Sequence, residues 1–86
     1  MVIKFNRSSS KYYSGDPNYD LTFIHALESF TNDKLCVCNE IKKSDFYNAF
    51  GVKMEGNDET YVCDWVVFKT TSQEDGYQIE IFMEDY

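Results

Sequence analysis

Residues 59–86 read ETYVCDWVVFKTTSQEDGYQIEIFMEDY, and this stretch decides the fold. Within residues 77–83 every odd-numbered residue is apolar (Tyr77, Ile79, Ile81 and Met83), whereas Phe82 is the only apolar residue at an even position. Such alternation is typical of a strand with one face in the core. Asp75-Gly76 is a turn signal just before this strand. We therefore expect an antiparallel hairpin formed by residues 59–71 and 77–84, with its turn in residues 72–76.

Further strands are predicted on the N-terminal side of this hairpin. Residues 61–68 are apolar on both parities except at Asp64, which favours an inner strand covered on both faces. Residues 52–55 are expected to pair with the beginning of that strand across Gly56. The alternation in residues 2–6 and in residues 35–41 predicts one strand in each segment.

Two helices complete the expected fold. Asp16-Pro17 is a helix start, because aspartate caps free N–H groups and proline suits the first helical position. Apolar residues then recur at spacings of three and four, which predicts a helix over 17–31 with this side on the sheet: Tyr19, Phe23, Ile24, Leu27 and Phe30. A short helix over about 45–50 is expected to be capped by Ser44 and ended by Gly51.

The sequence thus predicts a single domain, residues 1–86, of the α+β class. We expect an antiparallel sheet of about four to five strands, with the main helix packed on one face and the short helix beside it. No apolar run approaches the roughly 18 residues that a membrane helix needs. The three cysteines are an odd count that fits a reducing compartment, so we expect a cytoplasmic protein, in the host cytoplasm if a phage encodes it.

The charge of the chain is strongly asymmetric. Residues 44–86 carry ten carboxylates against two lysines, whereas residues 1–43 are nearly balanced and the whole chain has a net charge of −7. Self-repulsion on this scale suggests a basic partner. In the predicted hairpin, Asp58, Glu59, Glu84 and Asp85 meet at one end. The predicted partner-binding residues are Asp58, Glu59, Glu74, Asp75, Glu80, Phe82, Glu84 and Asp85.

Phe82 is the expected apolar anchor, because it lies between Glu80 and Glu84 on the solvent face of its strand. Two simpler interpretations stay open: the acidic face serves only solubility, or the N-terminal half of the chain folds over Phe82 and buries it. By analogy of size and charge alone, the predicted class is an inhibitor that occupies the basic surface of a nuclease or other nucleic-acid-binding protein. Nucleic-acid mimics, phage anti-defence inhibitors and nuclease immunity proteins share this profile.

Other functional classes have less support in the sequence. Cys36, Cys38, Cys63 and His25 form the only set that resembles a zinc site, but the cysteine spacing is not that of the common knuckle, so no metal or cofactor is expected. No motif for nucleophilic or phosphate chemistry is present, which predicts a non-enzymatic protein. Direct nucleic-acid binding is disfavoured by the acidic charge. The alternatives are a structural or accessory subunit with an apolar interface, and a homodimer in which the basic loop 7–13 meets the acidic face of a second copy.

Overall fold

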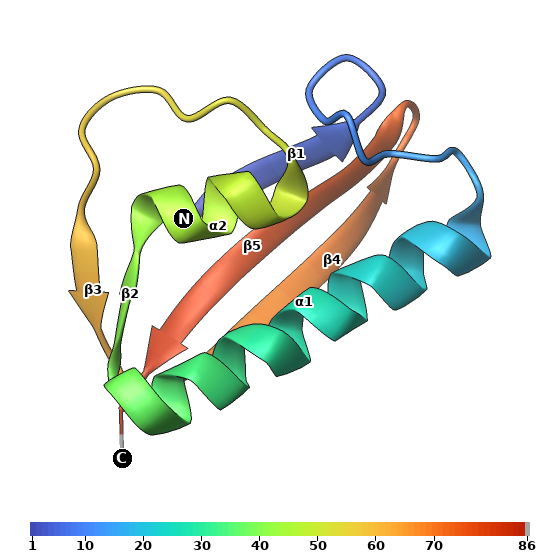
Figure 1. The fold of residues 1–86 in the computed structure, drawn as a ribbon. Helices are drawn as coiled ribbons and strands as arrows, with labels where there is room; N and C mark the ends of the chain where they lie inside the picture. The colour runs from blue at the N-terminus through green and yellow to red at the C-terminus, as the bar shows by residue number, and fades with distance from the viewer. Residues whose placement is uncertain (86) are drawn as a thin grey trace.

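The structure is a computed structural model that describes residues 1–85. It confirms the predicted α+β class (Figure 1). The elements in chain order are β1 Val2–Asn6, α1 Pro17–Cys38, β2 Glu40–Lys42, α2 Lys43–Phe50, β3 Thr60–Val62, β4 Trp65–Gln73 and β5 Gly76–Glu84. The five strands are divided between a three-stranded antiparallel sheet in the order β1-β5-β4 and a two-stranded antiparallel sheet of β2 and β3.

The predicted hairpin forms the body of the larger sheet. Gln73 pairs with Gly76, so Glu74 and Asp75 make the turn, and β5 lies between β1 and β4. Gly76 has φ +154°, and a Cβ atom at this position would lie 2.5 Å from the carbonyl oxygen of Phe5 on β1. Glycine is therefore required where the hairpin turn meets the neighbouring strand.

Both helices lie on the same face of this sheet, and the core fills the space between them (Figure 1). As predicted, the odd-numbered residues of β5 point inward, and Ile79 and Ile81 are buried. Phe5 of β1 stacks on Phe23 of α1 with ring centroids 5.5 Å apart and contacts Phe50 of α2 at 5.8 Å. This aromatic cluster joins the sheet to both helices.

The predicted strand over residues 35–41 is wrong in its first part, because α1 continues to Cys38. Leu35 is buried and extends the helical stripe of Ile24 and Thr31, while Val37 is 85% exposed. Asn39 is the C-cap residue of the helix; its backbone is left-handed (φ 58°), and its N–H donates to the carbonyl oxygen of Leu35. Only Glu40–Lys42 is extended. The predicted covered side also shifts: Tyr19 and Phe30 are exposed, and Asp20 is buried.

The predicted long strand over residues 59–71 is also wrong, because it is broken at Cys63 and Asp64 into β3 and β4. β3 pairs with β2, with Ile41 opposite Tyr61, rather than with residues 52–55. In that segment only Val52 makes a bridge, to Ser10. β4 is an edge strand of the larger sheet and not an inner one.

The short helix begins slightly earlier than predicted. Its N-cap residue is Lys42 instead of Ser44, and the Asp45 carboxylate accepts a hydrogen bond from the Lys42 N–H at 3.1 Å. Gly51 ends the helix in a left-handed conformation, as predicted. Neither of the helices within residues 1–85 is long and apolar enough to cross a membrane.

Candidate protein-binding surface

The outer face of the larger sheet, opposite the helices, carries an uncovered apolar patch. Phe82 on β5 lies opposite Val67 on β4, and their exposed fractions are 45% and 41%. Val2 on β1 is 50% exposed and lies opposite Glu80, two residues from Phe82. We call Val2, Val67 and Phe82 the outer patch. Phe82 is therefore on the solvent face as predicted, and the N-terminal half does not bury it.

The charges around the outer patch are mixed. Glu80 lies opposite Lys69 of β4, so one carboxylate next to Phe82 has a cation across the strand pair. Glu84 lies on the other side of Phe82, opposite Trp65, and is exposed. Glu80, in the middle of β5, therefore has a lysine on the neighbouring strand, whereas Glu84, at the end of β5, has a tryptophan there.

Three acidic residues are neighbours along the backbone where β5 ends: Asp64, Glu84 and Asp85. The Asp64 N–H donates to the carbonyl oxygen of Glu84 at 3.0 Å, which fixes the two residues side by side. Cys63 is buried beneath them. Burial raises the pKa of the Cys63 thiol, and the negative charges of Asp85 and Asp64 raise it further. We call this group the β5-end acidic group.

The prediction that Asp58 and Glu59 meet Glu84 and Asp85 at one end of the hairpin is wrong. The Asp58 carboxylate accepts hydrogen bonds from the Ser44 N–H and hydroxyl, both at 2.9 Å, at the beginning of α2. These bonds lower the pKa of Asp58. Glu59 lies beside Tyr61, whose pKa is raised by burial and then by a hydrogen bond with Glu59. Asp58 and Glu59 lie apart from Glu84 because the strand is interrupted at residues 63 and 64, which places β3 in the smaller sheet.

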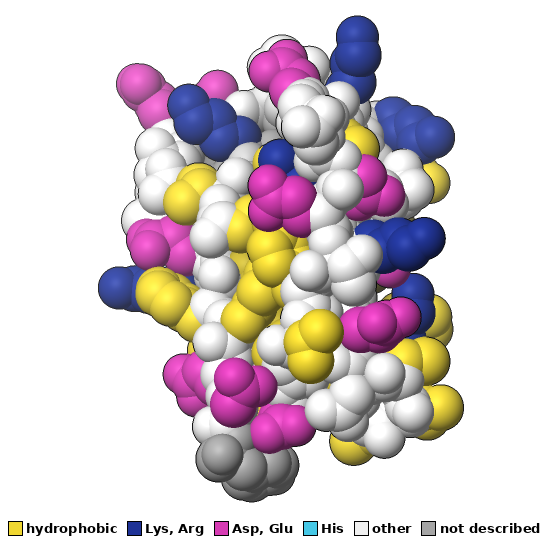
Figure 2. All heavy atoms as spheres, turned by 90° about the vertical axis from the view of Figure 1, so that its left-hand side faces the viewer, with side chains coloured by type: hydrophobic (Ala, Val, Ile, Leu, Met, Phe, Trp, Pro, Cys, Tyr) yellow, Lys and Arg dark blue, Asp and Glu magenta, His cyan; other side chains and the backbone are white. Residues whose placement is uncertain are grey.

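An open groove of about 520 Å³ lies between the larger sheet and the side of the molecule formed by α2 and β3. Figure 2 shows this side of the molecule, with a strip of apolar side chains in a hollow between separate acidic side chains. One wall comes from β1 and β5, and the other from α2 and β3; the lining residues are Met1, Val2, Lys43, Tyr47, Tyr61, Ile81, Phe82 and Met83. Phe82 and Val2 thus belong both to the outer patch and to the edge of the groove.

Glu74 and Asp75 lie far from the other predicted residues, at the opposite end of the hairpin. A nine-residue strand spans about 27 to 30 Å, which separates the turn from Glu84. The side-chain amide of Asn6 donates to Asp75 at 3.5 Å. The eight predicted residues therefore occupy three places: the hairpin turn, the face and end of β5, and the segment before β3. They do not form one continuous acidic surface.

Sequence reasoning missed Val2 and Val67 as members of the exposed surface. The hairpin register contained a signal for Val67, because a turn at Glu74 and Asp75 places Val67 opposite Phe82. No comparable local signal identifies Val2, since its neighbour depends on β1 pairing with a strand more than 70 residues away.

The cysteines are spread over two environments. Cys36 and Cys38 are exposed in the last turn of α1, while Cys63 is buried. His25 precedes Cys36 by eleven residues, which is about 16 Å along a helix. Within residues 1–85 no group of three or more histidine, cysteine, aspartate or glutamate side chains is placed to hold a metal ion.

This placement predicts the reactivity of the thiols. A thiol reagent added to the native protein should label Cys36 and Cys38 quickly and Cys63 slowly, because Cys63 is buried and its raised pKa reduces the reactive thiolate. Mass spectrometry of the labelled protein over time measures the two rates, and labelling in denaturant gives the reference for three accessible thiols. Equal native rates at all three sites would contradict the buried position of Cys63.

Comparison of the chain with protein-family models, with curated protein sequences and with solved structures finds no match.

Proposed function

We propose that this protein is a small, non-enzymatic acidic binding protein that occupies the basic surface of a nuclease or another nucleic-acid-binding protein. The observation that carries the proposal is the exposed aromatic ring of Phe82 beside the β5-end acidic group. An aromatic anchor with charged residues around it is a common arrangement of a binding hot spot.

The proposed mechanism is competition with nucleic acid. Phe82, Val2 and Val67 supply apolar contact, and the carboxylates of Glu84 and Asp85 pair with lysine or arginine on the partner. A net charge of −7 accelerates the encounter with a basic protein and keeps nucleic acid away. A partner surface covered in this way cannot contact phosphate groups.

Two variants of the protein test this mechanism. Phe82→Ala is expected to weaken capture of the basic partner from a host lysate by about 30-fold, the effect of losing a hot spot worth about 2 kcal/mol. The double variant Glu84→Lys/Asp85→Lys is expected to weaken it by at least as much and to reduce its dependence on salt. The measurement is binding of the eluted partner at graded salt, together with its residual activity on nucleic acid.

The matched control is Asp33→Lys/Glu55→Lys, which changes the net charge equally at two exposed positions outside the eight predicted residues. It should retain most of the binding. If it weakens binding as much as the β5-end variant, charge alone matters and Phe82 marks no site. Recovery of no basic protein at low salt, or a captured partner that remains fully active on nucleic acid, would refute the proposal.

A second candidate function is a structural or accessory subunit that associates through an apolar interface. The observation in its favour is the separation of the eight predicted residues into three places, together with the apolar character of the outer patch. This alternative predicts salt-resistant association that Phe82→Ala disrupts and Glu84→Lys/Asp85→Lys does not. Light scattering at low and high salt distinguishes the two functions.

A further inference from the structure

The two edges of the larger sheet are closed by side chains over part of their length. At the β1 edge, the Ser9 hydroxyl donates to the carbonyl oxygen of Lys4 at 2.7 Å and accepts from the Asn6 N–H at 3.1 Å. These bonds occupy backbone groups that a further strand would otherwise use. The serine turn after β1 therefore closes the end of this edge.

At the β4 edge, α1 provides the equivalent bonds. The Asn32 side-chain oxygen accepts from the Val66 N–H at 2.8 Å, and its amide nitrogen donates to the Val66 carbonyl oxygen at 3.1 Å. One helical turn earlier, Glu28 Oε2 accepts from the Phe68 N–H at 2.7 Å. Two side chains of the helix thus replace a neighbouring strand along the first half of β4.

The side-chain hydrogen bonds from α1 cover the β4 edge only as far as Phe68. Backbone groups of alternate residues point to the same side of a strand, so Thr70 and Ser72 face the same edge as Val66 and Phe68. Across residues 1–85, no hydrogen bond is recorded for the N–H and C=O groups of Thr70 and Ser72 on this edge. Four adjacent backbone groups are consequently available for pairing with an extended chain.

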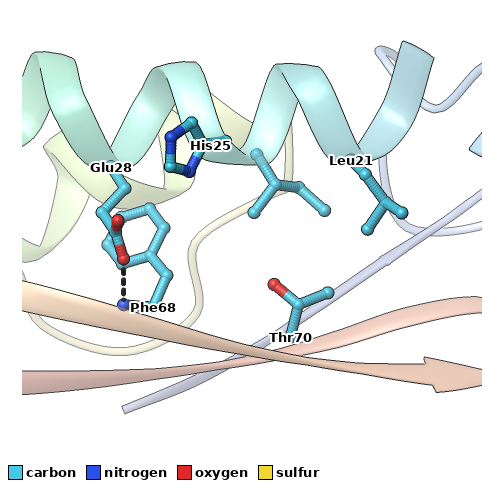
Figure 3. A pocket seen from close by; sticks show the side chains of 6 residues that line it. Leu21, His25, Glu28, Phe68 and Thr70 are labelled. Atoms are coloured by element: carbon cyan, nitrogen blue, oxygen red, sulfur yellow. Dashed lines mark hydrogen bonds between the residues drawn. The ribbon is translucent and has the colours of Figure 1, made fainter. Parts of the chain in front are cut away.

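A hollow of about 230 Å³ adjoins this open edge, between α1 and β4. Figure 3 shows the space between Leu21 of the helix and Thr70 of the strand, with Glu28 bonded to the Phe68 backbone at the closed end. The other lining residues are Ile24, His25 and the Phe68 side chain. The apolar side chains of Leu21, Ile24 and Phe68 line the hollow together with the polar ones of His25 and Thr70, and the Glu28 carboxylate lies at one end.

We propose that the open edge of β4 binds an extended, lysine- or arginine-bearing segment of a partner protein as an additional antiparallel strand. The partner residue opposite Thr70 exchanges two backbone hydrogen bonds with it and points its side chain to the same face, into the hollow. A long aliphatic stem contacts Leu21 and Ile24, and the cationic head reaches Glu28. Glu28 uses Oε2 for the Phe68 N–H, which leaves Oε1 for the cation.

The net charge of this protein favours a basic partner segment over a second copy of the chain at the β4 edge. A second copy of this chain would bring a net charge of −7 against another −7, so self-pairing through β4 is opposed by repulsion. A basic segment gains from the same charge and from Glu28 at the closed end of the hollow. This site goes beyond the proposed function, because it lies at the β4 edge and requires neither Phe82 nor the β5-end acidic group.

The test uses a synthetic peptide, acetyl-Val-Thr-Lys-Thr-Val-amide, and its matched control with glutamate in place of lysine. In an NMR titration of isotope-labelled protein, the lysine peptide should shift the amide signals of Thr70 and Ser72 most strongly. The glutamate peptide should bind about tenfold more weakly, because the charge-assisted bond to Glu28 is replaced by repulsion. Equal binding of both peptides, or shifts centred on Phe82, would overturn the proposal.

Two protein variants separate the backbone contribution from the charge contribution. Ser72→Pro removes one edge N–H at a position where an edge strand tolerates proline, and it should weaken the lysine peptide about tenfold. Glu28→Gln keeps an acceptor for the Phe68 N–H and removes the charge, so the two peptides should then bind alike. Circular dichroism verifies that both variants fold. Undiminished binding to folded Ser72→Pro, or a retained lysine preference in Glu28→Gln, would refute strand addition at this edge.

Discussion

Replacement of Phe5 by alanine is expected to lower the free energy of unfolding by about 3 to 5 kcal/mol, the usual cost of removing a buried aromatic ring. Phe5 is fully buried, and the centroid of its ring lies 5.6 Å from that of Tyr13, 5.5 Å from that of Phe23 and 5.8 Å from that of Phe50. These contacts connect β1, the loop before α1 and both helices. A domain of this length has a total stability of roughly 4 to 13 kcal/mol, so this loss removes a large part of it.

Urea unfolding followed by circular dichroism measures this loss, and Phe82→Ala is the matched control. It removes the same side chain from the outer face, where the ring is 45% exposed, and should cost about 1 kcal/mol or less. A similar loss for both variants would mean that the outer face is packed in solution. It would also remove the basis for Phe82 as a binding anchor.

Replacement of Asp20 by alanine is expected to cost about 3 kcal/mol, since it leaves several donors without their charged acceptor. The Asp20 side chain is fully buried in the first turn of α1. Its carboxylate accepts hydrogen bonds from the Ser14 N–H at 3.0 Å, the Ser14 hydroxyl at 2.8 Å and the Gly15 N–H at 3.1 Å. The loop before the helix is therefore held by one carboxylate.

Thermal unfolding of Asp20→Ala beside Asp33→Ala tests this role. Asp33 is an exposed carboxylate on the same helix, and its loss should change the stability by about 0.5 kcal/mol or less. Asp20→Asn keeps the shape and one acceptor oxygen, so its stability should fall between those of wild type and Asp20→Ala. Equal melting temperatures for the two alanine variants would contradict the structural role of Asp20.

Local signals predicted the parts of the fold that depend on neighbours in sequence. The alternation in residues 77–83 gave the inward face of β5, and Asp16-Pro17 gave the start of α1, where the Asp16 side chain accepts from the Asn18 N–H. The end of α1 was not predictable in this way. Leu35 and Val37 suit a strand pattern as well as a helix, and the burial of Leu35 in the core decides for the helix.

The only local marker of the break between β3 and β4 was Asp64, the one charged residue in residues 61–68. One aspartate is not enough to predict the end of a strand, and the pairing of β3 with β2 shows that two strands are present. In the candidate site too, local signals predicted only the features that depend on neighbours in sequence. The exposure of Phe82 depends on local alternation and was predicted, whereas the positions of Asp58 and Glu59 depend on the sheet to which β3 belongs.

The bonds from Asn32 and Glu28 to β4 also have a consequence for aggregation. Because two side chains of α1 occupy the edge at Val66 and Phe68, any local opening that lifts the helix uncovers the rest of the same edge. A continuous row of free backbone groups would then extend from Val66 to Ser72, next to apolar core residues. Loss of helix docking would therefore expose a strand edge on which another copy of the chain can pair. The packing of α1 on β4 thus reduces the tendency of the protein to aggregate.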